Sequence, residues 1–188
     1  MEIGWYPVKA APYDENYWNK YQALDATPCG TALTSMRMEL VSRHWSRRVI
    51  DIGIGGGRFV AERPDTRGFD INPHAVKWLT NRLSFFDPYS VTCDAMTFWD
   101  SLEHIYDPVP LLNNVRRFVF VSLPIFRGPA DILASKHFRR DEHCWYFTRL
   151  GLTRFMRRCG FRMLEISEME QAAGREQIES FVFERYFA

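Results

Sequence analysis

The chain has 188 residues, of which 46% are hydrophobic and 25% are charged. This mixture is typical of a soluble globular protein and excludes intrinsic disorder. Lys and Arg number 24 against 23 Asp and Glu, which leaves a formal net charge of +1. The composition therefore lacks the basic surface of a nucleic-acid-binding protein and the polybasic segment of a membrane anchor. We expect neither nucleic acid nor a membrane among its partners.

The cysteines are scattered singly along the chain, at Cys29, Cys93, Cys144 and Cys159. Without a CxxC pair, a zinc ribbon and a thioredoxin-type redox site are excluded. The first residues do not have the basic and apolar regions of a signal peptide, and no apolar run approaches the ~18 residues of a membrane span. We therefore expect a cytoplasmic protein with reduced thiols.

Residues 1–30 are rich in Pro, Gly and aromatic side chains, and they contain one helical pattern, over residues 14–24. Asp14 is a suitable N-cap there, and Tyr17, Trp18 and Tyr21 recur at helical spacing. Two interpretations of this aromatic segment stay open. It forms a lid over a bound ligand, or it packs as an ordinary amphipathic helix against the sheet.

From residue 31 onward, helical and strand patterns alternate. Helices are predicted to begin at Thr31 or Thr34 (ending at Trp45) and near residue 58, and to cover residues 73–83, 107–115 and 148–159. Strands are predicted over residues 49–52, 66–71, 94–99, 118–123, 162–169 and 178–186. This alternation predicts an α/β fold with a doubly wound, mostly parallel sheet that has helices on both faces.

The connection between the last two predicted strands is too short for a crossover helix, so the last strand should run antiparallel. We expect one domain over residues 1–188, in which the aromatic segment 1–30 precedes a core of residues 31–188.

A glycine-rich turn, Gly53-Ile54-Gly55-Gly56-Gly57, directly follows the first parallel strand. Glycine allows the backbone to turn sharply and to approach a ligand closely. Asp70 lies at the end of the next strand, where a carboxylate can accept hydrogen bonds from both hydroxyls of a ribose. Asp51, two residues before the first glycine, would repel a pyrophosphate but suits a cationic ligand. The pattern therefore favours S-adenosylmethionine over a dinucleotide, and the chain has no P-loop.

Three segments, residues 51–57, 68–72 and 98–104, resemble the class I S-adenosylmethionine-dependent methyltransferases. The Leu-Glu-His sequence at 102–104 is similar to that of a small-molecule branch which includes quinone-biosynthesis methyltransferases. Residues 146–148 and 160–161 resemble the last helix of this family and the strand after it. The resemblance covers residues 31–188 and implies a Rossmann-like fold, S-adenosyl-L-methionine as cofactor, and methyl transfer to a small-molecule acceptor.

The resemblance also implies roles for individual residues. Asp51, Gly53, Ile54 and Gly55 would surround the methionyl part of the cofactor, with Asp100 and Ser101 beside it. Asp70 would hold the ribose hydroxyls, and Ile71 would pack on the adenine. Tyr17 and Tyr21 would contribute if the aromatic segment is a lid.

The chain departs from the family in its middle. Between the Asp70 region and the strand that ends at Asp100, the family has a further strand and helix, whereas here only about ten residues are available. We expect a sheet with no full strand and helix between Leu83 and Asp94. The residue that contacts the adenine amine is therefore left unassigned.

Methyl transfer mostly requires that the nucleophile is positioned and water excluded, and a base is needed only if the acceptor loses a proton. His143 and His104 are the candidate catalytic residues. The segment 135–148 should fold over the carboxyl end of the sheet and bring His143 towards His104. The pairs Glu103-His104 and Glu142-His143 also suggest a metal site, but adjacent residues rarely bind one ion together, so we expect no metal.

Two other functions stay open. The chain could bind S-adenosylmethionine or S-adenosylhomocysteine without catalysis, or it could methylate a macromolecule. Against methylation of DNA amines, Asp100-Ser101-Leu102-Glu103 stands where such enzymes have a Pro-Pro motif. The acceptor atom and the oligomeric state do not follow from the sequence.

Overall fold

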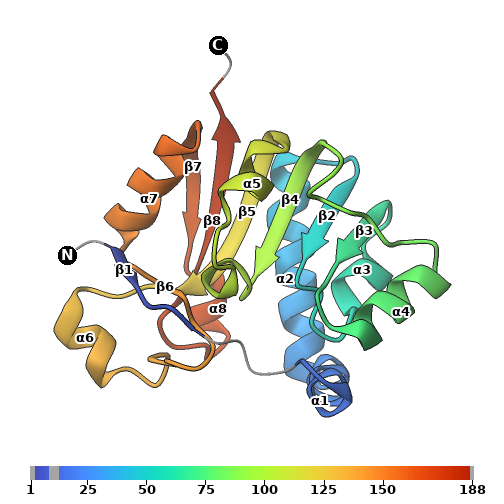
Figure 1. The fold of residues 1–188 in the computed structure, drawn as a ribbon, viewed down its shortest axis with the longest axis horizontal. Coiled ribbons are helices and arrows are strands. Elements are labelled where there is room, and N and C mark those ends of the chain that lie inside the picture. Colours follow the sequence, from blue (N-terminus) through green and yellow to red (C-terminus); the bar gives the residue numbers. More distant parts are fainter. Residues whose placement is uncertain (1–2, 9–12, 187–188) are drawn as a thin grey trace.

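The computed structural model describes residues 3–8 and 13–186. Its centre is a six-stranded sheet in the order β3-β2-β4-β5-β8-β7, shown in Figure 1. The strands are β2 (Val49–Ile52), β3 (Thr66–Phe69), β4 (Cys93–Trp99), β5 (Val115–Pro124), β7 (Phe161–Ser167) and β8 (Ile178–Arg185). Strand β2 pairs in parallel with β3 and β4, and β4 pairs in parallel with β5.

Strand β8 runs antiparallel to both of its neighbours, β5 and β7. The prediction of an antiparallel last strand is confirmed. Because the chain crosses from β5 to the edge of the sheet before it turns back, this strand inserts between β5 and β7 instead of forming the edge. The sheet is therefore mostly parallel, as predicted.

The helices are α1 (Glu15–Asp25), α2 (Pro28–His44), α3 (Arg58–Glu62), α4 (Pro73–Asn81), α5 (Val109–Asn113), α6 (Pro129–Ala134), α7 (Arg149–Arg158) and α8 (Met169–Ala172), with a 3-10 turn η1 (Leu102–His104). Asp14 caps α1 as predicted, by accepting from the Tyr17 N–H at 2.9 Å. The predicted start of the second helix at Thr31 or Thr34 is wrong. Thr27 is its N-cap and Pro28 occupies the first turn, where a missing N–H has no cost.

Helices cover both faces of the sheet. Leu111 of α5 and Leu152 of α7 pack in one apolar cluster with inward-facing residues such as Phe98. Leu40 of α2 packs on the other face with Phe120 and its neighbours. Successive residues of a strand point to opposite faces. A strand covered by helices on both faces is therefore apolar at every position, which explains why the central strands could be recognised as continuous apolar runs in the sequence.

The middle of the fold is shortened, as predicted. Between α4 and β4 there is no helix, and the extended structure is limited to an isolated bridge between Gly68 and Phe85. Two backbone hydrogen bonds of 2.9 Å, Gly68 N to Ser84 O and Phe86 N to Gly68 O, hold this short segment beside β3. Strand β3 is consequently the last full strand on this side of the sheet.

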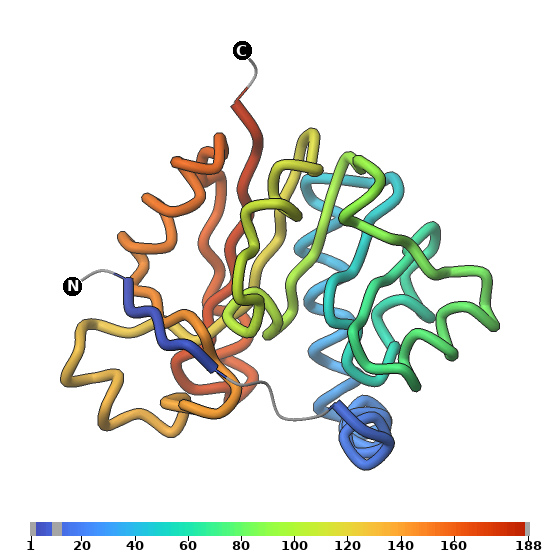
Figure 2. Tube along the Cα trace, viewed as in Figure 1, coloured from blue at the N-terminus to red at the C-terminus, as the bar shows by residue number. Residues whose placement is uncertain are grey.

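A second, two-stranded sheet is formed by β1 (Ile3–Trp5) and β6 (Trp145–Phe147), which run antiparallel. Neither strand was predicted, because three residues are too few to show the alternation of apolar and polar side chains that marks a strand. The Cα trace in Figure 2 shows the N-terminal segment alongside residues 145–147. An isolated bridge between Ile125 and Phe147, with a 2.9 Å hydrogen bond from Phe126 N to Phe147 O, joins β6 to the end of β5 and so holds the segment that contains His143 next to the central sheet.

Candidate functional site

The glycine-rich turn lies at the carboxyl end of β2. Gly53, Gly55 and Gly57 have positive φ values of 75°, 57° and 90°, a conformation that L side chains rarely adopt. A Cβ on Gly53 would also lie 2.7 Å from the Cβ of Ser101. Ser101 itself is buried and donates a hydrogen bond to the Ile52 carbonyl at 2.5 Å. The turn is thus held close to the end of β4 and can take no side chain at Gly53.

Two carboxyl groups flank this turn. Asp51 is 1% exposed and accepts a hydrogen bond from the Thr97 hydroxyl at 2.6 Å. Burial raises the pKa of Asp51 to about 7, although the Thr97 hydroxyl acts in the opposite direction. Asp70 accepts from the Ile54 N–H at 2.9 Å and from the Asn72 N–H at 2.8 Å. Burial raises the pKa of Asp70 as well.

Both oxygens of Asp70 keep a lone pair, because each carboxylate oxygen can accept more than one hydrogen bond. A ligand placed against the turn can therefore donate to Asp70 without breaking its bonds to the backbone. Ile71, the next residue, is 63% exposed. An apolar side chain left open beside an acceptor carboxylate suits a ligand that has a flat apolar part and hydroxyl groups.

Helix α1 crosses the carboxyl end of β2, at the lower end of the sheet in Figure 1. A Cβ on Gly55 would lie 3.6 Å from the Tyr21 ring, and the Asn72 side chain donates to the Asp14 carbonyl at 3.1 Å. The Tyr17 and Tyr21 rings lie 4.6 Å apart. Burial, followed by the hydrogen bond with Tyr21, raises the pKa of Tyr17. The aromatic helix therefore contacts the glycine-rich turn.

Asp100, at the end of β4, belongs to an ionic cluster that the sequence did not indicate. Its carboxylate is 2.8 Å from Arg37 Nη2 and 2.9 Å from Arg175 Nη1, and both arginines also pair with Glu170. The Glu170 side chain is 0% exposed. Desolvation raises the pKa of Asp100, but the two guanidinium groups outweigh it, so that the net shift is downward.

Sequence reasoning missed Arg37, Glu170 and Arg175 because they come from α2, α8 and the loop after it, far apart in the chain. No local pattern marks such a cluster. The one available signal was a glutamate and an arginine in the short connection between β7 and β8, which lies close to Asp100 only in the folded chain.

The structure brings His104 and His143 together, as the sequence predicted. Their ring centroids are 4.6 Å apart in an edge-to-face arrangement. Glu103 is next to them and is 2% exposed. One ligand atom from each of these three residues lies within 4.8 Å of the other two, so the group has the geometry to hold a metal ion.

Burial disfavours the charged form of each of these three side chains. Burial, reinforced by the neighbouring His104, lowers the pKa of His143 to about 3. Burial also lowers the pKa of His104. Burial and the nearby Asp100 raise the pKa of Glu103 well above its usual value.

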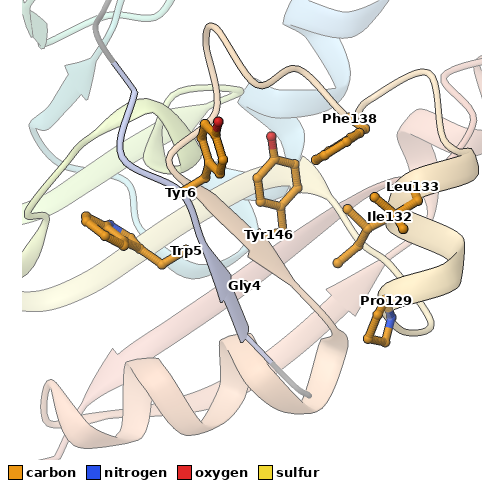
Figure 3. A pocket seen from close by; sticks show the side chains of 8 residues that line it. All are labelled: Gly4, Trp5, Tyr6, Pro129, Ile132, Leu133, Phe138 and Tyr146. Carbon is orange, nitrogen blue, oxygen red and sulfur yellow. The ribbon is translucent and has the colours of Figure 1, made fainter.

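An apolar groove opens next to β1 and β6 (Figure 3). It has a volume of about 200 Å³ and is lined by Trp5 and Tyr6 from the N-terminal segment, Ile132 and Leu133 of α6, and the rings of Phe138 and Tyr146, among others. The Tyr146 ring also lies 6.0 Å from the His143 ring, centroid to centroid. Tyr146 thus joins the groove to the histidine pair.

Residues 35–166 match the family model described as a methyltransferase domain. Because this match spans most of the chain and coincides with the glycine-rich turn and the sheet, the chain belongs to that family and is a class I S-adenosylmethionine-dependent methyltransferase. No curated protein sequence matches it. Among the described residues, no helix is long and apolar enough to cross a membrane.

Solved structures with the same fold are distant in sequence. Magnesium protoporphyrin IX methyltransferase from Synechocystis PCC 6803, with bound S-adenosylhomocysteine, is 11% identical at a TM-score of 0.66, covering 93% of this chain and 96% of that one. A possible histamine N-methyltransferase from Thermotoga maritima is 13% identical, with a TM-score of 0.63 and coverage of 92% and 98%. The 1,6-didemethyltoxoflavin-N1-methyltransferase of Burkholderia thailandensis is 12% identical, with a TM-score of 0.62 and coverage of 98% and 95%.

Proposed function

We propose that this methyltransferase transfers the methyl group of S-adenosylmethionine to a small-molecule acceptor. The observation that carries the proposal is the position of the His104–His143 pair directly after Asp100 and Ser101, at the carboxyl end of β4, with Tyr146 between the pair and the apolar groove. In parallel sheets, this is the edge at which ligands bind. Neighbours with the same fold act on small molecules, among them 1,6-didemethyltoxoflavin.

The residues around the glycine-rich turn fit the cofactor. Asp51, Gly53, Ile54 and Gly55 would contact the methionyl part, where the ionised form of Asp51 attracts a cation. Asp70 would accept from the ribose hydroxyls. When bound, the cofactor supplies a methyl group on a positively charged sulfur.

The remaining contacts complete the proposed cofactor site. Ile71 is exposed on the side where the adenine would lie. Asp100 and Ser101 would border the methionyl part, with the charge of Asp100 already balanced by arginines. Tyr17 and Tyr21 would cover the cofactor, since α1 contacts the turn.

On the acceptor side, His104 and His143 would face the nucleophilic atom of the acceptor and accept its proton. His143 is buried and His104 is partly buried, and each has a buried Nδ1 without a hydrogen-bond partner among the described residues. An uncharged imidazole can accept a proton or a hydrogen bond from the acceptor. The apolar groove would take the hydrophobic part of the molecule, with Tyr146 between the two.

The proposal is tested first by cofactor binding. Calorimetry should detect S-adenosylmethionine or S-adenosylhomocysteine, and Asp70→Ala should weaken binding by roughly 10- to 100-fold, since a carboxylate that accepts two hydroxyl hydrogen bonds contributes ~1.5–3 kcal/mol. Binding of NAD instead, or an unaffected Asp70→Ala variant, would contradict the assignment.

Turnover distinguishes the enzyme from a protein that only binds the cofactor. In a panel of small acceptors with an apolar part, one should be methylated, and His143→Ala should reduce that turnover by ~10²–10⁴ with little change in cofactor affinity. A thermal melt of the variant separates a chemical role from a structural one. If only peptide or nucleic acid substrates are methylated, the small-molecule proposal fails.

A further inference from the structure

Three neighbouring side chains in the candidate site have buried polar atoms that lack hydrogen-bond partners within the described residues. These atoms are Glu103 Oε2, His104 Nδ1 and His143 Nδ1. Buried polar atoms in folded proteins are nearly always paired. When three such atoms come from residues that face one another, a single bound group could satisfy all of them.

The separations suit a small cation better than an organic ligand. One ligand atom from each residue lies within 4.8 Å of the other two. A tetrahedral ion with bonds of ~2.0–2.1 Å holds its ligand atoms about 3.3 Å apart. Side-chain movements of about an ångström would therefore close the set around one ion.

The surrounding bonds hold these side chains in place. Glu103 and His104 lie in η1, and the segment of His143 is tied to it by two hydrogen bonds, Cys144 N to Glu103 O at 2.7 Å and Trp145 Nε1 to Ile105 O at 2.8 Å. The His104 and His143 rings also contact each other edge to face, with their centroids 4.6 Å apart, which keeps the two imidazoles side by side.

Asp100, whose charge acts on Glu103, is already paired with other groups. Asp100 is bonded to Arg37 and Arg175, so it is balanced by protein cations and does not need a metal. Glu103 is paired with neither arginine, and Arg139, the other cation close to it, bonds Glu142 instead. A cation that balances the ionised form of Glu103 would therefore have to come from outside the protein, and the two imidazoles could bind the same cation.

We propose that Glu103, His104 and His143 bind a divalent transition-metal cation whose open coordination position receives the methyl acceptor. Two imidazoles and one carboxylate are a ligand set of zinc and related ions, and three protein ligands leave a position free, as in catalytic sites. Glu103 and His104 are adjacent in sequence, which argued against a metal, but the fold supplies the third ligand from a distant loop.

This inference rests on the proposed function for the identity of the incoming ligand, and it narrows the acceptor to a molecule with a metal-binding oxygen such as a hydroxyl. Bound to the cation, that hydroxyl loses its proton to solvent more readily. Its oxygen lone pair then forms the bond to the methyl carbon, while the sulfur keeps the electron pair of the broken bond. This replaces the direct acceptance of a proton by an imidazole that was proposed above: the histidines would hold the cation and act through it.

The test is a calorimetric titration of the metal-free protein with Zn²⁺. We expect one site per chain, and at least about 100-fold weaker binding in His104→Ala, His143→Ala and Glu103→Gln. His74→Ala removes a histidine outside the cluster and is the matched control, which should bind like the unmodified protein. Thermal melts identify variants that fail to fold. If the histidine variants do not fold, the Zn²⁺ affinity of Glu103→Gln, which conserves the shape of the side chain, tests the proposal.

Spectroscopy and turnover provide independent readouts. Co²⁺ should give visible absorption bands of a low-coordinate site in the unmodified protein and in His74→Ala, but not in Glu103→Gln. Chelation should abolish turnover, and Zn²⁺ should restore it. Failure of the unmodified protein to bind Zn²⁺, equal binding by Glu103→Gln, or turnover that survives chelation would overturn the proposal. Absence of S-adenosylmethionine binding would instead refute the proposed function, and the metal titration would remain interpretable.

Discussion

Asp51 offers a quantitative test of the electrostatics of the site. Its carboxyl group is 1% exposed, and burial raises its pKa from 3.8 to about 7 in the folded chain. In the unfolded chain this group ionises near its ordinary pKa, so the folded state binds more protons between the two values. The folding free energy therefore becomes less favourable as the pH rises from about 4 to about 7, and the penalty is constant above that.

The substitution Asp51→Asn removes the charge while it conserves the shape of the side chain. With 1.36 kcal/mol per pKa unit, the two pKa values give a penalty of ~1.7 kcal/mol at pH 5 and ~4.3 kcal/mol at pH 8 in the unmodified protein. The new amide leaves a donor to be satisfied, at a cost of ~1–3 kcal/mol, but this cost is the same at both pH values. The stability of the variant relative to the unmodified protein should therefore increase by ~2.6 kcal/mol from pH 5 to pH 8.

Urea unfolding of both proteins at the two pH values measures this difference. A relative stability that is equal at pH 5 and pH 8 would refute the reasoning, because Asp51 would then titrate alike in the folded and unfolded chains. The same carboxylate predicts that the affinity for S-adenosylmethionine rises as the pH increases through 7 and that Asp51→Asn loses this dependence.

Three further predictions concern other parts of the site. Glu170→Gln should destabilise the fold by ~3 kcal/mol, since it leaves two arginines without their buried partner, whereas the exposed Glu176→Gln should cost less than ~1 kcal/mol in urea unfolding. Gly53→Ala should weaken cofactor binding and destabilise the protein by ~1–3 kcal/mol, because Gly53 has a positive φ. The control is Gly128→Ala, since Gly128 has open space around it, and equal melting temperatures of the two variants would contradict the prediction. Leu133→Asp should raise the KM of an apolar acceptor about tenfold without changing the melting temperature, and an unchanged KM would remove the groove from the acceptor site.

The individual strands and the glycine-rich turn were accessible from local patterns, whereas the order of the strands in the sheet was not predicted. A buried strand such as Val49–Ile52 is apolar on both faces, and a turn that requires positive φ is marked by glycine at Gly53 and Gly55. The short connection after Leu83 could be counted, which is why the missing strand and helix were predicted. The three-residue strands β1 and β6 could not be, because their pairing joins segments about 140 residues apart.

The sequence by itself determined the class of fold and the meeting of His143 with His104, and it predicted the end of the sheet at which a ligand should bind. These depend on hydrophobic periodicity, on backbone conformations that only glycine adopts readily, and on the rule that the carboxyl ends of parallel strands share one edge. Only the tertiary structure decided how charges are balanced. Arg37 and Arg175 neutralise Asp100, whereas Glu103 stays buried without a cationic partner among residues 3–8 and 13–186. Pairing of charges depends on distances across the folded chain, and side chains from α2, η1 and the loops meet there without leaving any periodic trace in the sequence.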